Sequence, residues 1–451
     1  MRGTSGRRIG TYQQQLWISL GPLPSRLGGY FFSKVEKMLA GKNLRLKTDS
    51  LLLRGSLGCP LLFRQLYILG SISMSRWLAF AWVSLISTIV VTVCASETSW
   101  AWGERGHDHV AIVAARLAEQ ELGPKSSFTR ILREKEAMLA HLANVPDIVW
   151  KQLDQATFES NSNTHFIDLE YLATKPSFAT VPRSFKDMTV AVQNFCKTNN
   201  NNERDKICSE LASRRHEAVA KAGSAHLRMK QLQLMMLSAL QTAAQAKDKT
   251  TKIDAVNEAL TVGGIMGHFA GDLAQPMHTS SDYDGYDSGH GGLHVYFEGN
   301  LVDAQDLQLI AQVYKAALPR RELRRIRAAV PQELRANTED FGMLLAEAEA
   351  FDSHQQMDRL RALDKKFALI KPSSNERGMR IPAERKDAAL AAAGFKPLIV
   401  ERLSVGAQVL AELWVQTYKL AGSPDLSEFK SYFYPVAPKF IPPVYVTDFP
   451  L

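Results

Sequence analysis

A long apolar helical pattern ends in a histidine and an aspartate, and this ending limits what the chain can fold into. The pattern covers residues 253–270 of a 451-residue chain. His268 and Asp272 are four residues apart, so both side chains point from one face of that helix. Pro276 then ends the helix. The sequence therefore predicts a helical scaffold in which one helix end presents an imidazole and a carboxylate side by side.

More side chains of the same kind follow directly. His278 lies in the turn after the helix, and His294 and Glu298 repeat the four-residue spacing. This segment thus combines imidazoles with carboxylates and contains no cysteine. That donor set is typical of a zinc site that keeps a position open for water, and it is not that of a structural zinc finger.

Helical periodicity dominates the chain beyond residue 101, and strand-like sequence is confined to short stretches such as residues 444–446. Apolar residues recur at helical spacing in further segments: 110–122, 128–142, 204–222, 226–246, 304–318, 320–330, 341–351, 383–393 and 398–421. We therefore predict an all-α fold, with one multi-helix domain over residues 102–451.

Residues 74–101 have the pattern of a secretory signal peptide, with a positive start, an uncharged run over residues 77–96 and small residues before Trp102. We expect export to the periplasm or out of the cell after cleavage before Trp102. Cleavage after Ala95 is a weaker alternative. In another alternative, residues 77–96 remain as a membrane anchor, because the run is nearly long enough to span a bilayer.

The basic charge balance belongs to the first 101 residues, which carry 12 Lys/Arg and 3 Asp/Glu against 42 and 43 in the remainder. Net charge beyond residue 101 therefore does not predict a surface that binds polyanions. The arginine-rich stretch 320–327 could meet phosphate, although most such runs are solvated helix faces. Residues 1–73 have no sustained periodicity, and we interpret them as an upstream extension before a natural start at Met74.

Two of the four cysteines flank a polar loop. Cys196 and Cys208 enclose an asparagine-rich stretch that reads as a loop by composition. In an exported protein we expect them to form a disulfide across that loop. The alternative is a pair of unpaired thiols in a flexible segment.

Candidate ligands also lie upstream of the helix. Asp147 follows Ala-Asn-Val-Pro, His165 begins the sequence His-Phe-Ile-Asp, and His107 lies five residues after Trp102. In their order from Trp102 to Glu298, these residues resemble the superfamily of zinc-dependent bacterial phospholipases C and single-strand-specific nucleases of fungi and plants. Residues 172–205 and the residues after 300 make this chain longer than the compact pattern of that superfamily.

The resemblance implies three zinc ions per chain. It assigns Asp147, His165, His268 and Asp272 to the first ion, Trp102, His107 and Asp272 to the second, and His278, His294 and Glu298 to the third. Asp272 would then bridge the first two ions. Trp102 would act as the mature N-terminus, through its free amine and its own carbonyl. Asp147 is the candidate catalytic base, with a role purely as a ligand as an equal alternative.

The resemblance leaves the substrate class open. The His-x-x-x-Glu form of the third ligand set and its short distance from His278 resemble the phospholipases. The His-Phe-Ile-Asp sequence resembles the nucleases, so Phe166 and Asp168 are candidate substrate-binding residues. Packing of Phe166 and orientation of an imidazole by Asp168 are the alternatives.

We therefore expect a zinc-dependent hydrolase of phosphodiesters. The pattern places phospholipase C chemistry on a phospholipid slightly ahead of nuclease or nucleotidase chemistry on single-stranded nucleic acid. A zinc-binding protein without turnover is a further alternative. No obligate protein partner is inferred.

Overall fold

The computed structural model describes residues 102–172, 181–198, 206–211, 219–335 and 337–446. The expected signal peptide, the alternative anchor and the upstream extension lie outside these residues, and so those parts of the predicted domain division stay predictions. No helix within the described ranges is long and apolar enough to cross a membrane.

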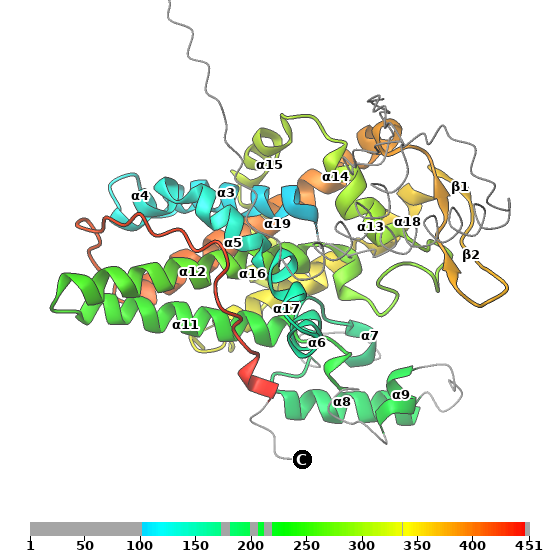
Figure 1. The fold of residues 1–451 in the computed structure, drawn as a ribbon, viewed down its shortest axis with the longest axis horizontal. Helices are drawn as coiled ribbons and strands as arrows, with labels where there is room; N and C mark the ends of the chain where they lie inside the picture. Colours follow the sequence, from blue (N-terminus) through cyan, green and yellow to red (C-terminus); the bar gives the residue numbers. More distant parts are fainter. Residues whose placement is uncertain (1–101, 173–180, 199–205, 212–218, 336, 447–451) are drawn as a thin grey trace, which may run out of the picture. The chain divides into compact units, whose positions relative to one another are not determined.

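The described chain is mostly helical, which confirms the predicted all-α class (Figure 1). Its five main helices are α3 (Gly103–Leu122), α5 (Glu136–Ile148), α11 (Ala225–Gln245), α12 (Lys249–Ala274) and α19 (Ala388–Leu420). Helix α12 packs against each of the other four. Every residue of its second half, from Val262 to Ala274, is buried. The helix that carries His268 and Asp272 is therefore the central helix of the domain.

Shorter elements surround these helices. They are α4 (Ser127–Glu134), η1 (Trp150–Gln152), α6 (Gln155–Ser162), α7 (Leu169–Leu172), α8 (Phe185–Thr198), α9 (Lys206–Leu211), η2 (Pro276–Thr279), α13 (Leu293–Val295), the π-helical turn η3 (Tyr296–Asn300), α14 (Leu301–Asp303), α15 (Leu309–Ala317), α16 (Arg321–Ala329), α17 (Phe341–His354), α18 (Met357–Asp364) and η4 (Val444–Val446). A disulfide joins Cys196 of α8 to Cys208 of α9, which confirms the predicted pairing.

Several predicted boundaries were wrong. The segment 128–142 is divided between α4 and α5, which meet at Lys135. Residues 388–393 and 398–420 belong instead to the single helix α19, which runs through Pro397, whereas residues 383–387 are part of a β-hairpin. A proline removes one helical hydrogen bond, but Phe395, Leu398 and Ile399 on either side of it are fully buried, and their packing keeps the helix continuous.

The structure also contains a β-hairpin that the sequence did not predict, which we call the β-arm (residues 365–387). Strand β1 (Ala368–Ile370) pairs with β4 (Glu384–Arg385), and β2 (Ser373–Ser374) pairs with β3 (Arg380–Ile381), both antiparallel. Figure 1 shows the β-arm beside α18 and α13. Its strands have almost no buried face, so they lack the alternation that marks a strand in sequence. The stretch 444–446, which looked strand-like, is the 3-10 helix η4.

Candidate metal centre

Three groups of buried histidine and carboxylate side chains lie around the C-terminal end of α12. The groups are Asp147, His165 and His268; His107, His268 and Asp272; and His278, His294 and Glu298. Within each group the candidate ligand atoms all lie within 4.8 Å of one another. The structure thus brings together all the histidine, aspartate and glutamate side chains that the sequence predicts as metal ligands. Their assignment to particular ions stays a prediction.

The first group is oriented by a backbone carbonyl. Nδ1 of His268 lies 2.7 Å from the carbonyl oxygen of Ala143 in α5, so its Nε2 faces the site. That Nε2 lies 2.8 Å from Nδ1 of His165 and 3.6 Å from Oδ1 of Asp147. Ligand atoms bound at zinc distances in a tetrahedral arrangement are about 3.3 Å apart. The spacing of these donors therefore fits one shared ion.

Asp272 connects the first group to the second. Its Oδ2 lies 3.1 Å from Nδ1 of His165 and 3.2 Å from Nε2 of His268. Its Oδ1 instead lies 3.5 Å from Nε2 of His107. The two oxygens of one carboxylate thus face two ligand groups, which is the geometry that a bridging ligand requires.

The third group is built on the segment after α12. Glu298 Oε2 lies 2.8 Å from Nε2 of His294 and 3.4 Å from Nε2 of His278. Nδ1 of His278 lies 2.8 Å from the carbonyl oxygen of His165, and Nδ1 of His294 lies 2.7 Å from that of Tyr283. A carbonyl at Nδ1 favours the tautomer with its proton there, which leaves Nε2 as the metal-binding atom.

The burial of these side chains also suits a metal. Both ring nitrogens of His107, Oδ1 of Asp272 and Oε1 of Glu298 are buried and make no hydrogen bond within the part of the chain that the structure describes. A buried polar atom without a partner costs free energy, so each native example requires an explanation. Metal ions would supply the missing partners, and so these residues fit the zinc that the sequence predicts.

Charge states at neutral pH favour the same conclusion. Burial lowers the pKa of His107 to about 3 and that of His165 to about 4, so both imidazoles are neutral. Burial alone would raise the pKa of Glu298, yet the His294 and His278 side chains lower it to about 2. For Asp272 as well, burial is outweighed by the nearby histidines, chiefly His268, which hold the pKa of its carboxyl well below the usual range. Neutral imidazoles and ionised carboxylates are the forms that bind metal. Burial alone would lower the pKa of His268 and His294, but the nearby carboxylates raise the pKa of His268, and Glu298 raises that of His294 to about 9, so these two rings must release a proton when a metal binds.

Trp102 lies beside the second group. Its side chain is fully buried, its Nε1 donates to the carbonyl oxygen of Gly271 at 2.5 Å, and its ring centroid is 5.4 Å from that of Phe297. Its own carbonyl accepts from the backbone N–H of Gly106 at 3.1 Å. Residue 101 lies outside the described residues, so chelation by the Trp102 amine stays a prediction.

The candidate substrate residues follow His165 directly. Phe166 is half-buried and packs against Gly223, where an added Cβ would lie 2.5 Å from the Cδ2 atom of the phenylalanine. Asp168 is buried, and its backbone N–H donates to the carbonyl oxygen of Ala222 at 2.8 Å. The structure therefore places both residues on the loop that carries the predicted ligand His165. Their contact with a nucleobase stays a prediction.

Lys151 was missed by the sequence analysis. Its Nζ lies 2.6 Å from Oδ1 of Asp147, four residues earlier. The helical spacing of an acid and a lysine was the available signal. This partly buried cation favours the ionised form of Asp147, and it brings a positive charge to the first group, where a phosphate could be attracted.

A buried arginine, Arg228, packs against the residue that follows the predicted ligand His268. The Arg228 guanidinium lies 5.8 Å from the centroid of the Trp150 ring and 5.5 Å from that of Phe269, which follows His268. It also donates to the carbonyl oxygen of Ile441 at 2.6 Å. Arg228 thus connects the C-terminal segment to the helix that carries the ligands.

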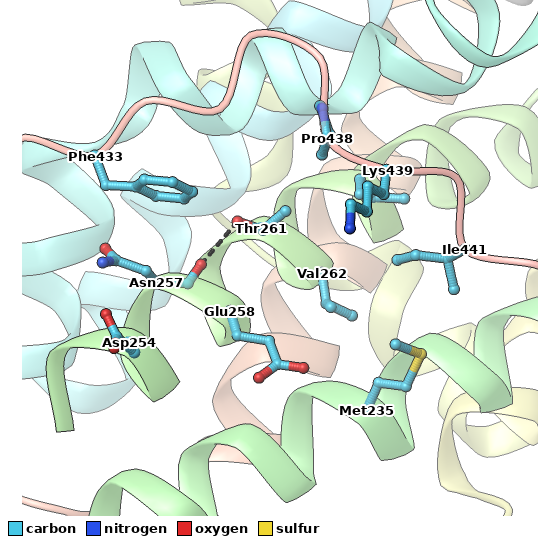
Figure 2. A pocket seen from close by; sticks show the side chains of 11 residues that line it. Met235, Asp254, Asn257, Glu258, Thr261, Val262, Phe433, Pro438, Lys439 and Ile441 are labelled. Carbon is cyan, nitrogen blue, oxygen red and sulfur yellow. Dashed lines mark hydrogen bonds between the residues drawn. The ribbon is translucent and has the colours of Figure 1, made fainter. Parts of the chain in front are cut away.

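A cavity of about 360 Å³ lies between α11, α12 and the C-terminal segment. Figure 2 shows its lining, which combines acids such as Asp254 and Glu258 with Lys439 and apolar side chains. None of the predicted metal ligands lines it. The cavity is therefore separate from the metal centre.

Comparison with known proteins gives one match. The family model described as S1/P1 nuclease matches residues 102–307. No curated protein and no solved structure matches the chain. The matched region begins at Trp102 and contains every predicted ligand, whereas α15 to α19 and the β-arm lie beyond it.

Proposed function

Because residues 102–307 belong to the S1/P1 nuclease family, a family of zinc-dependent phosphodiester hydrolases, we propose that this protein cleaves single-stranded nucleic acid. The sequence pattern alone placed phospholipase C chemistry slightly ahead. The family match supports the nuclease alternative better, although the His-x-x-x-Glu form of the third ligand set still resembles the phospholipases.

The observation that carries the proposal is the position of Asp272 between two ligand groups, with a third group close by in the sequence. We propose that these groups hold three zinc ions. When bound, zinc lowers the pKa of a coordinated water to about 7 and neutralises the charge of phosphate oxygens. The buried, preoriented histidines and carboxylates keep the donor atoms in place before substrate arrives.

The side chains of the first group have further roles in this proposal. Asp147 is ionised and would accept a proton from the attacking water, although its low pKa suits a role purely as a metal ligand equally well. Lys151, beside it, attracts the scissile phosphate and keeps Asp147 in its ionised form. Phe166, half-buried next to His165, stacks on a base, and this contact is sequence-tolerant because every base has a flat face.

We propose that the protein works outside the cytoplasm. The Cys196–Cys208 disulfide supports this location, because disulfides persist in oxidising compartments. Cleavage of the signal peptide before Trp102 would also produce the free amine that the second zinc site requires.

A parallel hydrolysis assay tests the proposed function. Purified protein is given single-stranded DNA, RNA, duplex DNA and phosphatidylcholine, first as isolated, then after chelation, and then after zinc is restored. We expect cleavage of single-stranded DNA and RNA that is lost with the chelator and regained with zinc. Hydrolysis of phosphatidylcholine alone would support the phospholipase alternative, and zinc binding without any turnover would support the non-catalytic one.

A further inference from the structure

The β-arm is a local exception to the charge balance of the domain. Residues 365–387 contain seven Lys/Arg and three Asp/Glu, whereas residues 102–451 as a whole carry 42 and 43. The β-arm also lies outside the region that the family model matches. Its positive charge is therefore a property of this chain that the family assignment does not explain.

Most cations of the β-arm are exposed and form no ion pair in the part of the chain that the structure describes. Arg385 pairs with Asp364 at 2.7 Å at the base of the β-arm. Lys366, Lys371 and Arg377 are exposed and form no ion pair within the described residues. In the arginine-rich stretch of α16, Arg325 and Arg327 pair with Asp352 and Glu412 at 2.6 and 2.7 Å, whereas the exposed Arg321 and Arg324 form no ion pair among the residues that the structure describes. A charged ligand thus meets free cations on the β-arm.

The base of the β-arm is fixed to the loop that leads into His294. The backbone N–H of Ala383 donates to the carbonyl oxygen of Gly291 at 2.9 Å, and Arg385 donates to the same oxygen at 3.0 Å. Arg385 also donates to the carbonyl oxygen of His290 at 2.7 Å. At Gly292, with φ of 79°, an added Cβ would lie 2.6 Å from Cβ of Pro382. The two segments are therefore in close contact.

A second contact connects the β-arm to the third ligand group. The Arg380 guanidinium lies 4.9 Å from the centroid of the Tyr286 ring. Tyr286 belongs to the loop whose Tyr283 carbonyl oxygen lies 2.7 Å from Nδ1 of His294. A cation of the β-arm thus contacts the same loop that orients His294, a predicted zinc ligand.

We propose that the β-arm is a docking surface for the sugar-phosphate backbone of a single-stranded nucleic acid that leads away from the third ligand group. This inference rests on the proposed nuclease function. A strand rises about 3.3 Å per residue, so the stretch from Ala368 to Ser374 reaches roughly 20 Å, enough to meet several phosphates. Proteins that bind single strands without sequence preference use a positively charged surface that follows the phosphate backbone.

The β-arm also exposes apolar side chains, with Leu369 at 56% and Ile370 at 60% exposure. Cations beside apolar residues can bind an anionic membrane as well. We favour the nucleic acid because the β-arm is attached to the ligand loop, which places its cations along the path of a polyanionic substrate. Membrane binding is an outcome that the experiment must distinguish.

The test compares two triple variants that remove the same charge. The β-arm variant combines Lys366→Gln, Lys371→Gln and Arg377→Gln, and the control combines Lys315→Gln, Arg321→Gln and Arg324→Gln, all exposed positions. Zinc-loaded proteins are assayed on a long single-stranded DNA and on a dinucleotide over a range of salt. Binding is measured by anisotropy with a cleavage-resistant phosphorothioate strand and by sedimentation with phosphatidylserine vesicles.

We expect the β-arm variant to bind the long strand about tenfold more weakly, with a salt slope reduced by about 2 because each lost phosphate contact removes about 0.7. Its KM on the long DNA should rise while kcat, and both constants on the dinucleotide, stay as in the control. Equal behaviour of the two variants, while the wild type cleaves DNA, overturns the docking role and leaves the nuclease function standing. A loss confined to vesicle binding also overturns it, and a wild type inactive on every nucleic acid removes both proposals.

Discussion

Oδ1 of Asp272 lies 3.5 Å from Nε2 of His107, while Oδ2 of the same carboxylate faces His165 and His268. The two oxygens of one carboxylate therefore face ligand atoms of both the first and the second group. Asp272→Ala should lower the zinc content from close to three ions per chain to about one, measured by elemental analysis. Asp254→Ala, an exposed position on the same helix, is the matched control and should keep all its zinc. Full zinc occupancy in Asp272→Ala would refute the bridging role.

The close approach of Gly271 to His107 gives a second prediction. A Cβ at residue 271 would lie 2.6 Å from Nδ1 of His107 and 2.9 Å from its Cε1. Gly271→Ala should therefore displace the imidazole and weaken the second zinc site, even though alanine improves helix propensity by roughly 1 kcal/mol. Zinc content and hydrolysis should fall while the circular dichroism spectrum keeps its helical form.

Gly299→Ala provides the comparison for that variant. An added Cβ at Gly299 meets no described atom within 4 Å, although this glycine directly follows Glu298. We expect Gly299→Ala to keep its zinc and its activity. If Gly271→Ala behaved in the same way, the packing of α12 against His107 would not matter to the site.

The central helix and its ligands could be predicted from sequence because their signals are local. His268 and Asp272 share a helix face by spacing alone, and Pro276 marks where that helix ends. The donor chemistry of the third group was equally local. In contrast, the carbonyl groups of Ala143 and Tyr283, which orient His268 and His294, come from packing between elements and leave no trace in the spacing.

The missed elements have their own physical reasons. The β-arm is exposed on both faces, so hydrophobic alternation does not mark its strands. Helix α19 continues through Pro397 because tertiary burial outweighs the lost hydrogen bond, which local propensity cannot anticipate. Lys151 was overlooked because a lysine four residues after an acid is common on solvated helices, and only the buried partner makes the pair informative.

The position of Trp102 leads to a prediction about the N-terminus. Its indole is fully buried against Gly271, and its backbone lies in the left-handed region at φ of 42°. A form that retains residues 74–101 keeps an amide in place of the free amine at Trp102, so one predicted ligand of the second zinc is lost. We expect such a form to have much lower specific activity than a form that begins at Trp102. Comparable activity of the two forms, with their N-termini verified by mass spectrometry, would exclude the chelating amine.

A buried acid outside the metal centre predicts a pH effect on stability. Burial raises the pKa of Glu347 from 4.5 to about 8, although Arg183 lies 3.5 Å away and opposes the shift. Between pH 4.5 and about 8, the Glu347 carboxyl therefore keeps a proton in the folded protein that it has lost in the unfolded chain. The stability that this difference provides is complete below pH 4.5 and is lost as the pH rises through about 8.

Glu347→Gln removes this titration because an amide stays neutral. Thermal unfolding at about pH 5 and about pH 9 should show a smaller loss of stability at high pH for Glu347→Gln than for the wild type. Glu333→Gln, at an exposed position on the preceding segment, should follow the wild type. An identical pH dependence in all three proteins would mean that Glu347 is already ionised when folded.

The third ligand group can be tested without disturbing the fold. Glu298 is fully buried, and its Oε2 accepts from Nε2 of Gln275 at 2.9 Å. In Glu298→Gln the side-chain oxygen can keep that hydrogen bond, and the amide is almost the same size as the carboxylate. It is, however, a poorer zinc ligand and carries no charge to match the metal. The third zinc should therefore be weakened while the helical core stays packed.

Glu298→Gln should lose the third zinc but keep its fold, so the two effects are measured separately. Circular dichroism and thermal unfolding of the zinc-loaded protein should report a helical fold, elemental analysis should find close to two zinc ions, and hydrolysis of single-stranded DNA should fall sharply. Glu258→Gln, an exposed acid on α12, should keep all three properties. The first two groups do not contain Glu298, so they should retain their metal and still bind phosphate weakly. Normal activity together with a full complement of zinc in Glu298→Gln would show that His278 and His294 act with a different third ligand.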